Sequence, residues 1–387
     1  MKFENLDLQD SVLDSLNNIG FKTPTRIQSE TIPLIQQGHD VIGRSKTGSG
    51  KTGAFGIPIV EKAVKGINAQ ALILAPTREL AKQIASDISQ FSYQKGLQVQ
   101  TVYGGVSMRP QVEGLKDSEI IVGTPGRILD HIRRGNFATE NIEFFVLDEA
   151  DTMIDMGFIN DIEKIARGIP EGRQTLLFSA TMPRNLVKVT ERLTNNARKV
   201  TTEIKVEEEL LKQYYYDVKH NEKFSLLVSL LVEEDPESAL IFCKTRIGTE
   251  RLTRNLRNNG IKAGALHGGL TQNKREQILD SFYKGKLRYL VATNVASRGI
   301  DVEHITHIYN YDVPDTVEDY VNRIGRTARA GKSGRAISLV TENERQQFKA
   351  MKRQYSYDIK KMVKTNYEII PFQAGKKHRK RSYKRYR

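Results

Sequence analysis

The sequence lacks the features that are typical of secreted and membrane proteins. One cysteine, Cys243, occurs in 387 residues, which excludes an internal disulfide and a cysteine-based metal site. No apolar run is long enough to cross a membrane, and the first stretch, MKFENLDLQD, lacks the basic-then-apolar pattern of a secretory leader. We therefore expect a cytoplasmic protein without membrane association, in which Cys243 is a small buried hydrophobic residue.

Acidic residues are the minority among the charges, and the imbalance is local. The net charge is +14. The last twelve residues, KKHRKRSYKRYR, contain eight Lys and Arg and no acid. A segment so poor in aliphatic residues is expected to be disordered. It is either a solvated tail or a sequence-indifferent grip on nucleic acid, and Tyr383 and Tyr386 between the cations favour the grip.

Short apolar runs alternate with amphipathic stretches along most of the chain. They lie at 40–45, 71–77, 99–105, 119–125, 144–151 and 175–181, then at 239–245, 263–269, 289–296, 304–314 and 335–342. Runs that are apolar on both faces are typical of parallel strands covered by helices. The alternation pauses in the polar stretch 196–213. We expect an α/β protein with two parallel-sheet domains at 1–203 and 214–365, a linker at 204–213 and a disordered basic tail at 366–387.

The stretch SKTGSGKT (45–52) follows the first of these runs. It fits the phosphate-loop pattern except that Ser45 stands where the pattern begins with glycine. Glycines let backbone N–H groups converge on phosphate oxygens, and the helix that follows favours an anion at its N-terminus. Lys51 can reach the β- and γ-phosphates of ATP, and Thr52 can ligate Mg²⁺. The other expected loop contacts are Ser45, Thr47, Gly48, Ser49 and Gly50.

The apolar run FFVLDEAD (144–151) ends in acidic residues. Carboxylates at the end of a buried strand are costly to leave unpaired. The sequence therefore predicts that Asp148 holds Mg²⁺ and that Glu149 orients and deprotonates the attacking water.

The stretch NRIGRTARAG (322–331) sets Arg323, Arg326 and Arg329 three residues apart without an acid among them. On a helix this spacing would point the guanidinium groups towards one side, where they repel unless an anion lies opposite. Taken alone, the stretch is more typical of a solvated helical face than of a site for an anionic partner.

These motifs and their order resemble those of the DEAD-box ATP-dependent RNA helicases, in a minimal bacterial form with a short basic tail. The phosphate loop, DEAD (148–151) and SAT (179–181) carry the resemblance, which extends to about residue 365. Further matching motifs are GFKTPTRIQ (20–28), PTREL (76–80), Gly104-Gly105, TPGR (124–127), IFCKT (241–245), QNKR (272–275), TNVASRGID (293–301) and NRIGRTAR (322–329).

The resemblance implies two RecA-like domains and a role for each motif. It implies that Phe21 and Gln28 bind adenine, that Gly299 and Asp301 also contact the nucleotide, and that Arg326 and Arg329 are arginine fingers for the γ-phosphate. Residues implied to couple ATP to RNA are Asp151, Ser179, Thr181 and Arg323. Residues implied to contact RNA are Pro76, Thr77, Arg78, Gly104, Gly105, Thr124, Gly126, Arg127, Gln272, Arg275 and Thr293.

Three positions depart from the family pattern. Asn322 replaces a usual His and cannot become cationic, Arg26 replaces a common Pro, and Asn294 replaces a common Asp. The resemblance implies a monomeric RNA helicase with RNA-stimulated ATP hydrolysis that unwinds short duplexes and remodels RNA–protein complexes. An ATP-dependent RNA clamp with little unwinding activity is the main alternative, which the Asn322 replacement slightly favours. A DNA-translocating helicase and a binding protein that acts through its tail alone fit the motifs less well.

Overall fold

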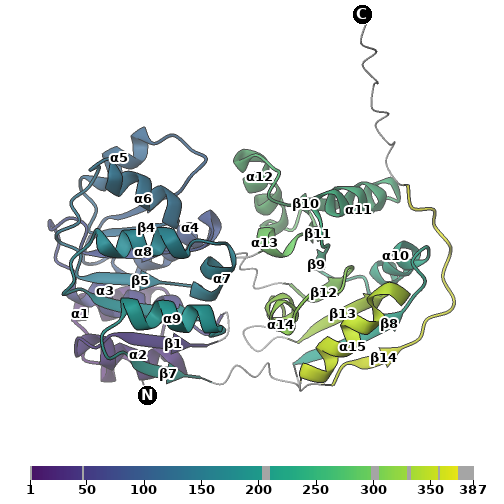
Figure 1. The fold of residues 1–387 in the computed structure, drawn as a ribbon, viewed down its shortest axis with the longest axis horizontal. Coiled ribbons are helices and arrows are strands. Elements are labelled where there is room, and N and C mark those ends of the chain that lie inside the picture. Colours follow the sequence, from purple (N-terminus) through teal and green to yellow (C-terminus); the bar gives the residue numbers. More distant parts are fainter. Residues whose placement is uncertain are drawn as a thin grey trace, which may run out of the picture. The chain divides into compact units, whose positions relative to one another are not determined.

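The computed structural model describes residues 2–45, 48–202, 210–297, 305–328, 333–355 and 358–373. The described residues up to 202 form one compact unit, and those from 210 form a second (Figure 1). Each unit is an α/β domain with its own sheet and hydrophobic core. Within the described ranges, no helix is both long and apolar enough to cross a membrane.

The first domain is built on a parallel sheet with the strand order β3-β4-β2-β5-β6-β1-β7. Its strands are β1 Val41–Arg44, β2 Ala71–Leu74, β3 Val99–Val102, β4 Ile120–Gly123, β5 Phe144–Leu147, β6 Gln174–Ser179 and β7 Arg198–Thr201. Its helices are η1 Phe3–Asn5, α1 Asp10–Asn18, α2 Arg26–Gln36, α3 Lys51–Lys62, α4 Arg78–Phe91, α5 Arg109–Leu115, α6 Pro125–Arg133, α7 Ala150–Asp155, α8 Ile159–Arg167 and α9 Arg184–Leu193.

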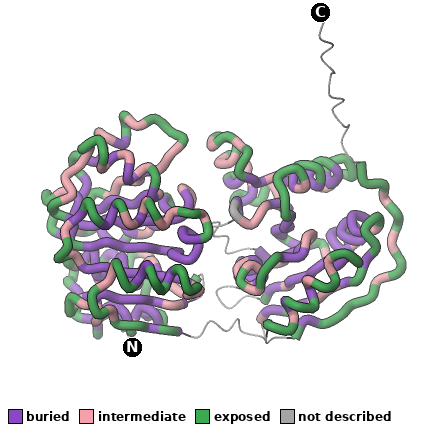
Figure 2. The backbone as a smooth tube through the Cα atoms, in the orientation of Figure 1, coloured by how far each residue is buried: buried purple, intermediate pink, exposed green. Residues whose placement is uncertain are grey.

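Two hydrophobic clusters cover the two faces of this sheet. Alternate residues of β5 divide between them: Phe144 and Val146 pack with α1 to α4, whereas Phe145 and Leu147 pack with α6 to α9. Figure 2 shows the strands as buried and the outer sides of the helices as exposed. Strands covered on both faces have to be apolar at every position, which is why the runs were recognisable in the sequence.

The second domain has the strand order β10-β11-β9-β12-β13-β8-β14, again parallel throughout. Its strands are β8 Leu211–Asp217, β9 Ala239–Phe242, β10 Ala263–Leu266, β11 Tyr289–Ala292, β12 His307–Asn310, β13 Gly334–Val340 and β14 Lys360–Met362. Its helices are α10 Lys223–Glu234, α11 Arg246–Asn258, α12 Gln272–Tyr283, α13 Asn294–Ser297, α14 Val317–Ile324, η2 Glu342–Glu344 and α15 Arg345–Gln354.

The second domain extends beyond the predicted bounds at both ends. Strand β8 starts at Leu211, inside the segment predicted as a linker. The prediction of a disordered tail from 366 is wrong for residues 366–373, which pack on α10 and α11 (Figure 1). Ser225 and Asn255 hold the backbone of Ile370 and Gln373 there. The polybasic segment 376–387 lies outside the described residues.

Cys243 is 1% exposed, as predicted. Burial raises the pKa of its thiol well above the usual value.

Candidate nucleotide and RNA sites

The phosphate loop joins the end of β1 to the start of α3. Gly48 and Gly50 have φ values of 77° and 89°, a conformation that glycine adopts without steric cost. Ser45 is fully buried, and its hydroxyl accepts a hydrogen bond from Ser49 Oγ at 2.8 Å, so a small residue serves at this position. Lys51 Nζ donates to Ser45 O at 3.2 Å. Thr52 follows in the first turn of α3, and Thr47 lies outside the described residues.

Gln28 lies against the phosphate loop. Its Oε1 accepts from Thr25 N at 2.9 Å, and its Nε2 donates to Gly50 O at 3.0 Å. A Cβ atom on Gly50 would lie 2.6 Å from Gln28 Nε2, so glycine is required there for this approach as well. The amide that the resemblance assigns to adenine is thus also tied to the loop that would hold the phosphates.

Phe21 lies beside two other aromatic rings. Its centroid is 5.5 Å from that of Phe91 and 6.3 Å from that of Phe3. Phe3 is 3% exposed, whereas Phe21 is 36% exposed. The contacts hold the Phe21 ring while leaving part of it accessible for stacking.

Asp148 and Glu149 follow the end of β5, and both are buried. Burial raises the pKa of Asp148 to about 6, although the nearby charge of Lys51 opposes the rise. The Glu149 backbone has a φ of 48°, and its N–H donates to Asp148 Oδ1 at 2.9 Å. A non-glycine residue in this region is strained, and such strain is concentrated at functional sites.

Asp151, Ser179 and Thr181 form one hydrogen-bonded group. Asp151 Oδ2 accepts from Thr181 N at 2.9 Å and from Thr181 Oγ1 at 2.7 Å. The Asp151 backbone N–H donates to Ser179 Oγ at 3.3 Å. This group ties the helix that starts after Glu149 to the segment that follows β6.

The predicted RNA contacts of the first domain gather at the carboxyl ends of β2, β3 and β4. Thr77 and Thr124 precede the first turns of α4 and α6. Pro76 comes directly before Thr77, and Gly126 is the second residue of α6. Gly105 has a φ of 80°, and a Cβ atom there would lie 2.3 Å from Arg78 Nη1. Arg127 donates to Val106 O at 3.3 Å. The structure therefore brings two arginines to the Gly104-Gly105 segment.

Sequence reasoning missed two buried residues beside this surface. Gln111 on α5 is 4% exposed and accepts a hydrogen bond from Arg127, and His131 on α6 is fully buried against Gln111. The available signal was the spacing of Arg127 and His131, four residues apart on one helix face.

The predicted RNA contacts of the second domain lie around the end of β11. Arg275 Nη2 donates to Ala296 O at 2.7 Å, and Thr293 N donates to Leu266 O at 3.2 Å. Gln272 Nε2 donates to Glu276 Oε1 at 3.0 Å. The structure thus places Gln272 and Arg275 on α12 and Thr293 between β11 and α13.

Arg323 and Arg326 do not share a helix face, because α14 ends at Ile324. Arg323 is 4% exposed and donates to Asn294 Oδ1 at 2.7 Å and to Asn310 Oδ1 at 3.0 Å. Burial lowers the pKa of Arg323 to about 10. Arg326 follows the helix in a turn. Arg329, Gly299 and Asp301 lie outside the described residues.

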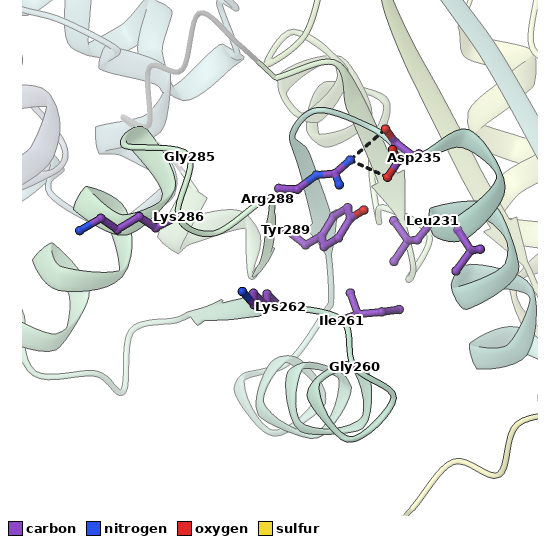
Figure 3. Close-up of a pocket in the computed structure, with 10 residues that line it drawn as sticks. Leu231, Asp235, Gly260, Ile261, Lys262, Gly285, Lys286, Arg288 and Tyr289 are labelled. Atoms are coloured by element: carbon purple, nitrogen blue, oxygen red, sulfur yellow. Dashed lines mark hydrogen bonds and ion pairs between the residues drawn. The ribbon is translucent and has the colours of Figure 1, made fainter.

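A pocket of about 520 Å³ lies elsewhere, at the amino ends of β10 and β11 (Figure 3). Helices α10, α11 and α12 all end beside it. Figure 3 shows Arg288 bonded to Asp235, and Arg288 also donates to Pro236 O. Cations complement the carbonyl groups at helix C-termini. Arg288 is therefore explained by the end of α10, and the pocket is separate from the sites above.

Comparison with known proteins agrees with this geometry. Residues 25–189 match the DEAD/DEAH box helicase family, and residues 222–331 match the helicase conserved C-terminal domain. The ATP-dependent RNA helicase CshA of Listeria monocytogenes is 46% identical over 89% of this chain and 66% of its own length. DEAD-box ATP-dependent RNA helicase CshA of Geobacillus kaustophilus is 46% identical over 88% of this chain and 74% of its own length.

Solved structures give the same result. Saccharomyces cerevisiae Dbp5 bound to RNA and ADP BeF3 has a TM-score of 0.87 at 30% identity, over 93% of this chain and 95% of that one. A DEAD box protein from Methanococcus jannaschii is 42% identical with a TM-score of 0.55, over 94% and 99% of the two chains.

Proposed function

Because this chain belongs to the DEAD-box family of ATP-dependent RNA helicases, we propose that it couples RNA-stimulated ATP hydrolysis to local melting of RNA duplexes and to remodelling of RNA–protein complexes. The observation that carries the proposal is the Asp151–Thr181 bond. It joins the acidic end of β5 to the segment after β6, within one domain that also holds the Arg78 and Arg127 surface. In this proposal, a change at the nucleotide site reaches the RNA surface of the same domain through this bond. We also propose that the chain acts as a cytoplasmic monomer.

In this proposal, ATP binds with its phosphates on the loop 45–52 and its adenine near Phe21 and Gln28. Lys51 stabilises the β- and γ-phosphates by its charge. The buried carboxyl of Asp148 and the hydroxyl of Thr52 are oxygen donors of the kind that Mg²⁺ prefers. Burial raises the pKa of Asp148, and a bound cation would favour its charged form. Bound Mg²⁺ would neutralise charge on the phosphates.

Glu149 is proposed to orient the attacking water and accept its proton. Its strained backbone and burial beside Asp148 support a fixed position for the carboxyl. Glu149→Gln keeps the shape and removes the base, so ATP binding should persist while kcat falls about 10²-fold or more. A Glu149→Gln protein that hydrolyses ATP at the native rate would remove this role.

Arg326 and Arg329 are proposed to complete the nucleotide site when the domains close on ATP and RNA. Phosphoryl transfer is catalysed mainly by positioning and charge, and an arginine finger contributes about 10³–10⁵ in rate. Because the arginines belong to a different domain from Lys51, hydrolysis becomes conditional on closure. Gly299 and Asp301 are proposed to contact the nucleotide, with Arg323 supporting this region from the interior.

RNA is proposed to bind through its backbone. In the first domain the contacts are Pro76, Thr77, Arg78, Gly104, Gly105, Thr124, Gly126 and Arg127, and in the second they are Gln272, Arg275 and Thr293. Contacts to phosphate and 2′-OH give little sequence preference and favour RNA over DNA. A joint surface that does not fit a straight A-form duplex would bend one strand and separate local base pairs.

Strand displacement on a short RNA duplex tests the proposed unwinding. We expect ATP-dependent release of the displaced strand, and release without covalent change to the RNA. If ATP increases RNA residence time but releases no strand from duplexes of about ten base pairs, the chain is a clamp instead.

The segment 376–387 is proposed to add a nonspecific grip on RNA. Each phosphate contact by a cation adds to the salt dependence of binding. Deleting 376–387 should therefore weaken RNA binding and reduce the slope of log affinity against log salt. An unchanged affinity and slope would show that the segment is only solvated.

A further inference from the structure

A single buried amide connects the parts of the proposed RNA surface in the first domain. Gln111 is 4% exposed and lies on α5. Its Nε2 donates to Tyr103 O at 3.0 Å and to Ser107 O at 3.5 Å, on both sides of the Gly104-Gly105 segment. Because backbone carbonyls can only accept, the orientation of the amide is determined by these two bonds.

The oxygen of the same amide accepts two further bonds. Its donors are His131 Nε2 at 3.2 Å and Arg127 Nη1 at 3.4 Å, both on α6. With these four bonds, every hydrogen and both lone pairs of the Gln111 amide are used. Gln111 thus connects a loop and an arginine that the family resemblance assigns to RNA.

The network also determines the protonation of His131, which is fully buried. Gln111 Oε1 only accepts, so His131 Nε2 must carry a hydrogen. The other ring nitrogen, Nδ1, then accepts from Asn136 Nδ2 at 2.9 Å. Burial lowers the pKa of His131, with Arg127 and Arg134 adding to the effect and Asp130 opposing it. The ring is therefore neutral and has one tautomer.

The network leaves part of the Arg127 guanidinium available. Nη1 and Nη2 donate to Val106 O at 3.3 Å and 3.4 Å. Together with the bond to Gln111, these leave Nε and one Nη2 hydrogen without a partner among the described residues. An arginine held from one side in this way presents donors to a phosphate on the other.

We propose that Gln111 and neutral His131 are positioning residues that fix Arg127 and the 103–107 segment for an RNA phosphate before RNA arrives. The inference rests on the proposed function, because it requires Arg127 to contact RNA. Fixing a flexible arginine in the free protein reduces the ordering entropy that binding would otherwise cost.

A double-mutant cycle of Gln111→Ala and Arg127→Ala tests the coupling. The readout is the concentration of single-stranded RNA that gives half-maximal ATPase stimulation, beside kcat at saturating RNA. Gln111→Ala should raise that concentration about fivefold, as expected for loss of an oriented charged contact, with kcat changed less than twofold. In a protein that already carries Arg127→Ala, Gln111→Ala should raise the half-maximal RNA concentration less than twofold further, because the arginine that Gln111 positions is absent.

His131 gives a second test with a built-in rescue. His131→Leu removes the donor to Gln111 and should raise the half-maximal RNA concentration. His131→Gln can place an amide N–H near the former Nε2 and should restore most of the affinity. Melting temperatures of all variants show whether a change in RNA response merely follows a loss of folding.

The outcomes separate the two levels of the proposal. If Gln111→Ala and Arg127→Ala act additively, or if Gln111→Ala lowers only the melting temperature, the positioning role is wrong and the RNA surface stands. If Arg127→Ala itself leaves the RNA response unchanged, the assignment of this surface to RNA is wrong, and the positioning role fails with it.

Discussion

The two domains share one strand order, but the helix that follows the first strand begins in a different environment in each domain. In each sheet the first strand of the domain lies between the sixth and the seventh. The first strand, β1, leads through a glycine-rich loop to α3, which begins with Lys51. Strand β8 leads through a segment without glycine, 218–222, to α10, which begins with Lys223. Both lysines are buried.

The partners of the two lysines explain the difference. Lys223 Nζ lies 2.8 Å from Glu344 Oε2 and 3.4 Å from Asp312 Oδ1, so two carboxylates surround it. Lys51 Nζ donates to a backbone carbonyl, and its charge does not prevent the pKa of Asp148 from rising to about 6. Lys223 therefore stabilises the fold between two carboxylates of its own domain, whereas Lys51 lies beside a glycine-rich loop of the kind that holds phosphates.

The largest expected effect distinguishes two arginines of the second domain. Arg326→Ala should lower kcat for RNA-stimulated ATP hydrolysis about 10³-fold. The matched change Arg323→Ala should lower the melting temperature, because Asn294 and Asn310 lose a buried partner. Steady-state ATPase assays and calorimetry on both variants measure this. If Arg323→Ala and Arg326→Ala lowered kcat equally while the two proteins stayed equally stable, the two arginines would not have different roles.

The lysine pair should show the next largest effect. Lys51→Ala should reduce kcat/KM for ATP at least about 10²-fold, since it removes a charge aimed at the phosphates. Lys223→Ala should leave the KM for ATP within about twofold once the protein is folded. ATPase kinetics at a temperature well below both melting points make the comparison fair. Near-native hydrolysis by Lys51→Ala would refute the role of the phosphate loop.

For stability, the order of the two lysines should be reversed, and Lys223→Ala should cause the larger loss. Lys223→Ala leaves two carboxylates facing each other without their cation, which should cost about 2–3 kcal/mol. Lys51→Ala removes a cation that donates a hydrogen bond to a backbone carbonyl, and we expect it to cost less. Denaturant unfolding, followed by hydrogen exchange in each domain, locates the loss. A larger loss of unfolding free energy from Lys51→Ala than from Lys223→Ala would mean that Lys51, and not Lys223, is the structural lysine.

The smallest expected effect is a pH dependence of the stability of the second domain, through Glu344. Although burial alone would raise the pKa of Glu344, the charge and hydrogen bond of Lys223 lower it below its usual value of 4.5. A depressed carboxyl pKa stabilises the fold above the unfolded pKa, and that contribution is lost as the pH falls through the folded value. Stability should therefore drop by about 1 kcal/mol below pH 4.5, and Lys223→Met should flatten this drop.

Central strands and loop motifs were predictable because their physics is local. Strands such as β2 and β5 are buried at every position, so their sequences are uniformly apolar. The phosphate loop is recognisable because its glycines, lysine and threonine are contiguous. The edge strands β7, RKVT, and β14, KKM, are largely exposed, and their composition does not distinguish them from loops.

Features that depend on distant partners were not predictable. Lys223 pairs with residues 89 and 121 positions away in the chain, and no local pattern indicates such pairing. The segment 366–373 is ordered by side chains of α10 and α11 rather than by its own composition. The end of α14 at Ile324 separates Arg323 from Arg326, which a helical reading of the three arginines overlooked although Gly325 follows.

Steady-state ATP hydrolysis without nucleic acid, with single-stranded RNA and with DNA of the same sequence, at two salt concentrations, tests the central claim most directly. We expect slow hydrolysis alone, strong stimulation by RNA and weak stimulation by DNA, and the RNA concentration needed for stimulation should rise at the higher salt. High hydrolysis without nucleic acid, or equal stimulation by DNA, would contradict the coupling of the two domains through RNA.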